Sequence, residues 1–172
     1  MIVPQKRFDK KDYSKNDLAY QALKNKFSTL YPVLRDEDFG VDVAIYNGKR
    51  AFEKGMSPIC YVELESKSNW KGLKFPKSFP DVQFLAKKQK FIKMDRPVYW
   101  VLFNDSCTNA AMINFKDIIS CELDIVTCGS IGSDYFYRIP LKKMMWGIDN
   151  LERYLIHDAF QALNQFHQQM IS

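Results

Sequence analysis

The feature that most restricts the fold of this chain is an unbroken apolar run at residues 98–103, within the segment PVYWVLFN. A run of six residues is too short to span a membrane, which takes about 20. A strand that is apolar on both faces is typical of the middle of a sheet. Residues 97–104 are therefore predicted to be a central strand. The 172 residues are enough to bury a core around it, and residues 1–172 are expected to form a single domain.

Helical and strand periodicities predict further elements around this strand. In chain order they are a helix over residues 14–30, strands over 41–46 and 59–67, strands over 109–113 and 134–139, and a helix over 150–170. Asn47-Gly48 is a hairpin turn signal between the first two strands. Residues 80–94 fit either one helix, or a short strand over 82–85 followed by a basic helix. This order predicts an α/β fold with a central mixed β-sheet flanked by helices.

Positive charge is concentrated in one segment. Residues 67–96 contain nine basic and two acidic side chains, a balance of +7, and the rest of the chain contains 16 basic and 18 acidic, a balance of −2. Aromatic residues such as Trp70 and Phe79 are interleaved with these lysines. Such a cluster attracts a polyanion. The alternative is a lysine-rich face whose only role is to be solvated.

The cysteines and the N-terminal sequence indicate where the protein works. None of the four cysteines belongs to a CxxC pair, which argues against a structural zinc site and favours reduced thiols. The first residues, MIVPQKRFDKKDYSK, contain no apolar segment of the kind found in secretory signals. A cytoplasmic protein without a membrane partner is expected. Nucleotide-binding and serine-hydrolase motifs such as GxxxxGK[ST] and GxSxG are also absent from the sequence.

The residues that indicate chemistry are Glu63, Glu65 and Lys67. Alternate residues of a strand share a face, so these three charged groups lie in a row. Burying them is costly unless they meet water, one another or a metal ion. Asp42 is predicted to lie in the middle of the preceding strand, and if the strands are neighbours its carboxylate would lie beside Glu65. Such oxygen ligands suit Mg²⁺. The alternative is that Glu63, Glu65 and Lys67 form the solvent-exposed face of an edge strand.

With Asp42 in GVDVAIY and Glu65-Ser66-Lys67 in YVELESKSNW, the chain resembles the PD-(D/E)xK nuclease superfamily, which includes restriction endonucleases and Holliday-junction resolvases. The resemblance implies a restriction-endonuclease-like core. It also implies that Asp42 and Glu65 hold Mg²⁺, for which Mn²⁺ can substitute, and that Lys67 acts near the attacking water. Asp17 is the candidate for the accessory acid that the family often carries on its first helix. Glu63 adds a third carboxylate, so that Glu63-x-Glu65 is an alternative acidic pair.

These observations predict a Mg²⁺-dependent endonuclease that hydrolyses DNA phosphodiester bonds, with RNA left open as a substrate. A homodimer is also considered, because cutting both strands commonly requires two sites. The alternative is a non-catalytic nucleic-acid-binding domain, or a nuclease-like subunit of a larger complex. The basic residues expected to contact nucleic acid are Lys71, Lys74, Lys87, Lys88 and Lys90.

Overall fold

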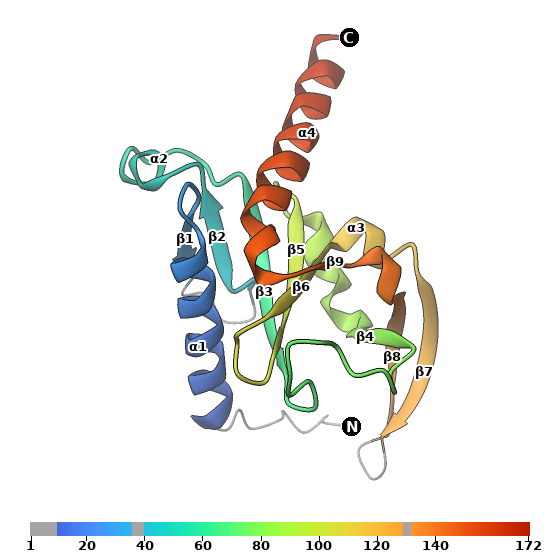
Figure 1. Cartoon of the computed structure of the whole chain (residues 1–172). Coiled ribbons are helices and arrows are strands. Elements are labelled where there is room, and N and C mark those ends of the chain that lie inside the picture. The colour runs from blue at the N-terminus through green and yellow to red at the C-terminus, as the bar shows by residue number, and fades with distance from the viewer. Residues whose placement is uncertain (1–9, 36–39, 129–131) are drawn as a thin grey trace.

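A six-stranded sheet crosses the centre of the computed structural model, which describes residues 10–35, 40–128 and 132–172 (Figure 1). Its strands lie in the order β1 (Tyr31–Leu34), β2 (Val43–Tyr46), β3 (Cys60–Lys67), β5 (Val98–Asn104), β6 (Ala110–Asn114) and β9 (Met145–Trp146). β3 and β5 are parallel, whereas the other neighbouring pairs are antiparallel. The predicted α/β fold with a central mixed sheet and flanking helices is confirmed.

The predicted central strand is β5, and all of its residues are buried. It pairs with β3 on one side and β6 on the other, so its backbone groups are satisfied within the sheet. Its alternating side chains enter two different cores. Tyr99 and Val101 contribute to one, and Trp100 and Leu102 contribute to the other.

Two helices, α1 (Lys10–Lys26) and α4 (Leu151–Ile171), cover the first of these cores. Leu23 of α1 and Leu155 of α4 are fully buried in the same cluster as the even-numbered residues of β3. α4 is also held by hydrogen bonds, because the Tyr99 hydroxyl donates to the Asp158 carboxylate and Asn114 Nδ2 donates to the same oxygen at 3.1 Å. The first half of α4 is therefore firmly anchored to the sheet.

A second, three-stranded sheet covers the other core. Its strands lie in the order β4 (Asp81–Leu85), β8 (Gly132–Pro140) and β7 (Glu122–Cys128). Phe84 of β4 packs edge-on against Trp100, with ring centroids 4.8 Å apart. The 3-10 helix η1 (Ala86–Lys93) follows β4 directly and closes this side together with α3 (Phe115–Ile118). Of the two predictions for residues 80–94, the short strand followed by a basic helix is confirmed.

Several predicted boundaries are wrong. The first helix begins at Lys10 and ends at Lys26, and Pro32 lies in β1, an edge strand, where a missing N–H is tolerated. Asn47-Gly48 does not form a tight hairpin. Gly48, with φ +94°, instead precedes the short helix α2 (Lys49–Glu53), which separates β2 from β3. A glycine with positive φ serves a helix entry as well as a turn, so the dipeptide alone does not distinguish the two.

The remaining short elements connect the second sheet to α4. They are η3 (Leu141–Lys143) and η4 (Ile148–Asn150). β7 and β9 are strands that the sequence patterns do not predict. Among the described residues, no helix is both long and apolar enough to cross a membrane.

Candidate active site

The candidate site lies on the face of β3 that looks toward the second sheet. Strand alternation places Glu63, Glu65 and Lys67 on this face, as predicted, together with Tyr61, which belongs to the core beneath the second sheet. Exposure increases along the strand, since the Glu63 side chain is 8% exposed and that of Glu65 is 43% exposed. Glu63 is therefore the buried member of the row, and Glu65 stands at the border with solvent.

Asp42 immediately precedes β2 and does not lie in the middle of a strand. β2 and β3 pair with Val43 opposite Val62, and one further step along this register brings Asp42 level with Glu63. The Asp42 Oδ2 atom accepts a hydrogen bond of 2.7 Å from the backbone N–H of Leu64, which fixes the carboxylate against β3. The acidic partner across from Asp42 is therefore Glu63, and not Glu65 as expected from the sequence.

Lys88 joins the acidic residues from η1. Its Nζ lies 2.8 Å from Glu63 Oε1 and 3.8 Å from Glu65 Oε2, and its side chain is only 26% exposed. Lys88 is one of five lysines that the sequence predicts to contact nucleic acid, and in the structure it is the cation of the carboxylate cluster. We call Asp42, Glu63, Glu65 and Lys88 the acidic cluster.

Lys67 lies elsewhere. Its Nζ is 5.0 Å from the centre of the Phe79 ring, a distance typical of a cation–π contact. The side chain thus stacks on the loop between β3 and β4. The ion pairs with the acidic side chains are made by Lys88 and not by Lys67.

The pKa values in the acidic cluster reflect crowding of negative charge in a buried place. The pKa of Glu63 is raised to about 7, chiefly because the side chain is buried; Lys88 lowers this pKa and the neighbouring Asp42 raises it. Burial also raises the pKa of Asp42, against the Leu64 N–H and Lys88, which lower it. For Lys88, burial lowers the pKa, but Glu63 and Glu65 outweigh this and the net shift is upward. The cluster has one cation for three acids.

One oxygen of Glu63 has no hydrogen-bond donor. Its Oε2 atom is buried without a partner, while Oε1 is the atom that meets Lys88. The adjacent group is the Asp42 carboxyl, and two carboxylates attract each other only when a proton or a cation lies between them. A buried polar atom left in this state is costly, so a bound ion would be stabilising here.

The residues fit a hard divalent cation. Asp42 and Glu63 together supply carboxylate oxygens, and Mg²⁺ is commonly held by one or two carboxylates with waters in its other positions. Within residues 10–35, 40–128 and 132–172, no three histidine, cysteine or acidic side chains converge closely enough to hold a metal ion as they stand. A site built from the protein alone would therefore have two carboxylate ligands, with Glu65 at its border.

The other predicted residues are dispersed. Lys74, Lys87 and Lys90 are exposed, whereas Lys71 is exposed and forms an ion pair of 2.8 Å with Asp105. Asp17 is exposed on α1, the helix that covers the opposite face of the sheet. The structure therefore does not bring this acid to the cluster.

Sequence reasoning missed the special position of Lys88. Nothing in the run Lys87-Lys88-Gln89-Lys90 distinguishes its three lysines, and only the packing of η1 against β3 and β8 selects one of them. A usable signal was present for Glu63. It is the first acid after three apolar residues of β3, so it is the acid nearest to the buried part of the strand.

Comparisons with known proteins return few matches. No family model matches the chain, and a search of curated proteins finds no match. Among solved structures, the chain is similar to D212, described as a nuclease from a fusellovirus. The two share 16% sequence identity with a TM-score of 0.47, over 95% of this chain and 99% of that one.

Proposed function

We propose that this protein is a Mg²⁺-dependent endonuclease of the PD-(D/E)xK type that hydrolyses phosphodiester bonds in DNA. The observation that carries the proposal is the buried pair Asp42 and Glu63, which has a donor-free oxygen and lies beside a lysine at the start of a basic helix. A purely structural cluster would be expected to satisfy its buried oxygens. A cluster that binds a cation and phosphate needs one of them free.

In this mechanism Asp42 and Glu63 are the metal ligands, with Mn²⁺ able to replace Mg²⁺, and Glu65 lies beside them. The bound ion would supply charge stabilisation for the phosphate and a water of lowered pKa. During hydrolysis the water oxygen bonds to phosphorus, one ester P–O bond breaks, and the departing oxygen takes a proton.

Lys88 has the role that the resemblance assigns to Lys67. In the absence of substrate its ammonium is held by Glu63 and Glu65, where it offsets their charge. When the carboxylates are occupied by a divalent ion, this ammonium is free to face a phosphate oxygen of the substrate. The exposed lysines Lys74, Lys87 and Lys90 would hold the nucleic-acid backbone through charge alone.

The test is a cleavage panel of plasmid, linear duplex and branched DNA in Mg²⁺, Mn²⁺, Ca²⁺ or EDTA. Wild type is expected to cut in Mg²⁺ and Mn²⁺ and to bind without cutting in Ca²⁺, which prefers looser coordination. Asp42→Asn, Glu63→Gln and Lys88→Ala are expected to abolish cutting. Lys87→Ala, which removes the neighbouring exposed lysine, is the matched control, and it is expected to weaken DNA binding without abolishing cutting.

The outcomes separate the proposal from its alternatives. Salt-sensitive DNA binding without cleavage under any of these conditions would favour a non-catalytic binding domain. Cleavage that persists in EDTA would contradict the metal mechanism. If Lys88→Ala cleaves DNA fully and Lys67→Ala does not, the lysine that acts at the site is Lys67 and not Lys88.

A further inference from the structure

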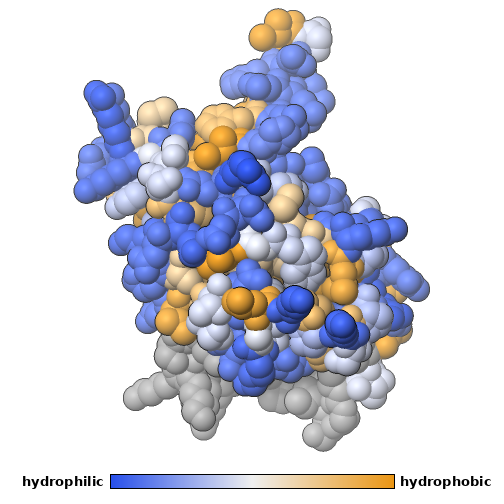
Figure 2. Space-filling model, in the orientation of Figure 1, coloured by the Kyte–Doolittle hydropathy of each residue, from blue (hydrophilic) through white to orange (hydrophobic). Residues whose placement is uncertain are grey.

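Helix α4 leaves the body of the molecule halfway along its length (Figure 1). Leu155 and Ala159 in its first half are fully buried. Farther along the helix, Phe166 is 55% exposed and Met170 is 73% exposed, although both continue the same apolar stripe. Figure 2 shows hydrophobic surface at the tip of this projection. The stripe that packs on the core thus extends past the core.

The spacing of the stripe is that of a helix–helix seam. Ala159, Leu163, Phe166 and Met170 are separated by four, three and four residues, which is the alternation of core positions in a heptad repeat. The projecting segment of about 12 residues would be marginal as an isolated helix, because most helix stability in proteins comes from packing an apolar face. A partner packed along its apolar stripe would therefore stabilise this segment as a helix.

The projecting segment contains no acidic residue, and His167 is its one basic residue. Residues 159–172 contain no Lys, Arg, Asp or Glu, in a chain whose residues are 26% charged. Without lysine or arginine it has little with which to hold a phosphate backbone. The chain as a whole has a net charge of +5, which opposes the approach of two copies except through a neutral face. This segment is such a face.

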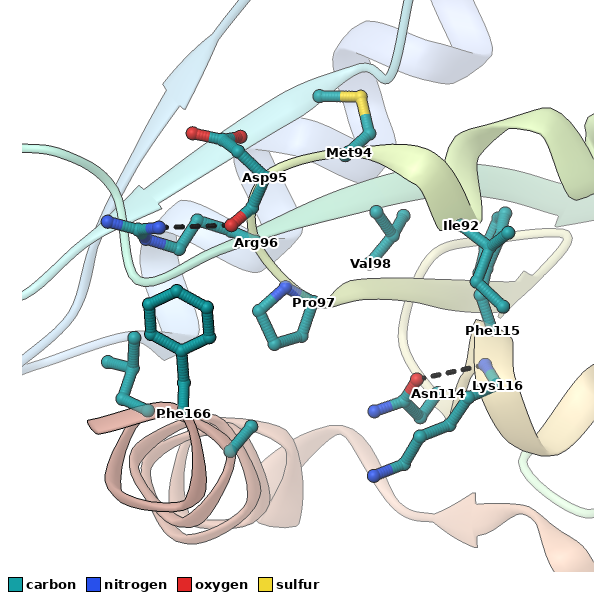
Figure 3. Close-up of a pocket in the computed structure, with 12 residues that line it drawn as sticks. Ile92, Met94, Asp95, Arg96, Pro97, Val98, Asn114, Phe115, Lys116 and Phe166 are labelled. Carbon is teal, nitrogen blue, oxygen red and sulfur yellow. Dashed lines mark hydrogen bonds between the residues drawn. The ribbon is translucent and has the colours of Figure 1, made fainter. Parts of the chain in front are cut away.

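A cleft adjoins the stripe at the base of the projection. It has a volume of about 470 Å³ and lies between α4, the loop from η1 to β5, and the start of α3 (Figure 3). Leu163 and Phe166 of α4 line one side, and Ile92 and Pro97 lie on the other. Asp95, Arg96 and Lys116 also line this cleft, so the apolar stripe continues into a surface that is partly apolar and partly charged.

We propose that this surface binds a second copy of the same chain, with the two α4 helices antiparallel about a twofold axis. Leu163, Phe166 and Met170 of each copy pack against those of the other. The projecting segment spans about 18 Å at 1.5 Å per residue, so the antiparallel order brings the tip of each helix to the cleft of its partner. Neutral flanking positions suit this pairing, because they impose no like-charge repulsion.

The inference is independent of the proposed nuclease activity, and its test is the mass of the full chain in solution. Sedimentation velocity and light scattering over a range of micromolar concentrations are expected to show a dimer. The double variant Phe166→Gln with Met170→Gln is expected to weaken dimerisation at least tenfold. Glutamine is a good helix former and already abundant in this segment, so the circular dichroism spectrum should lose at most the helical signal of the projecting segment.

The matched control is Leu123→Gln with Ile125→Gln on β7, which removes two apolar side chains of similar exposure, 50% and 55%, outside the proposed surface. This control is expected to remain dimeric. A monomeric wild type over the whole concentration range would overturn the proposal. So would a double α4 variant that stays dimeric, or a β7 control that dissociates equally.

Discussion

Glu63→Gln should stabilise this protein at alkaline pH, although it removes one partner of an ion pair. Glutamine mimics the protonated form of Glu63 in shape and charge. The pKa of that carboxyl in the folded protein is about 7, against 4.5 for an unperturbed glutamate, because it is buried and faces Asp42. The folded protein therefore favours the neutral side chain, and the ionised form reduces stability.

The size of the effect follows from the pKa difference. One unit corresponds to about 1.4 kcal/mol, so the rise to about 7 sets an upper limit of roughly 3 kcal/mol on the gain from Glu63→Gln. Between pH 4.5 and 7 the folded protein binds more protons than the unfolded chain, so wild-type stability falls as pH rises. The variant should match wild type near pH 4 and should exceed it by about 1–3 kcal/mol above pH 7.

The assay is urea unfolding in EDTA at closely spaced pH values, with the free energy of unfolding compared at constant m-value. Glu65→Gln is the matched control on the same strand face. Its side chain is 43% exposed, so it should change stability little at any pH. Adding Mg²⁺ at pH 8 should then stabilise wild type more than Glu63→Gln, because the ion binds the ionised pair.

A result that would refute this reasoning is a Glu63→Gln variant less stable than wild type at pH 8. That outcome would mean that the contact with Lys88 outweighs burial and the repulsion from Asp42. A difference in stability between Glu63→Gln and wild type that does not vary with pH would also refute the reasoning. The effect of the substitution would then come from packing and not from the ionisation of Glu63.

Three further outcomes are expected. Lys88→Ala should lower the free energy of unfolding at pH 8 by about 3 kcal/mol, because it leaves Glu63 buried without a cation, whereas Lys87→Ala should stay within about 0.5 kcal/mol in the same urea titration. Lys74→Ala and Lys90→Ala should weaken DNA binding and each lower its logarithmic salt dependence by about 1, as measured by fluorescence anisotropy. Phe84→Ala should cost about 3–5 kcal/mol in thermal unfolding, since its ring fills the core between the two sheets.

Local patterns in the sequence were sufficient for much of the fold. The apolar run of β5 predicts its central position, because a strand with two apolar faces must be covered on both. The alternation of β3 puts Glu63, Glu65 and Lys67 on one face, because side chains on a strand repeat every two residues. The heptad-like spacing of α4 predicts a long helix in the same way. Each of these properties is set by the neighbours of a residue along the chain.

Only the tertiary structure decided which charged groups meet. The helix α2 between β2 and β3 replaces the expected tight turn, and the resulting register brings Asp42 to Glu63 instead of Glu65. The packing of η1 against β3 selects Lys88 for the acidic cluster, while Lys67 stacks on Phe79. These pairings join residues that are 12 to 25 positions apart. They depend on strand register and helix docking, which are determined by burial of the whole core. No local sequence pattern predicts them.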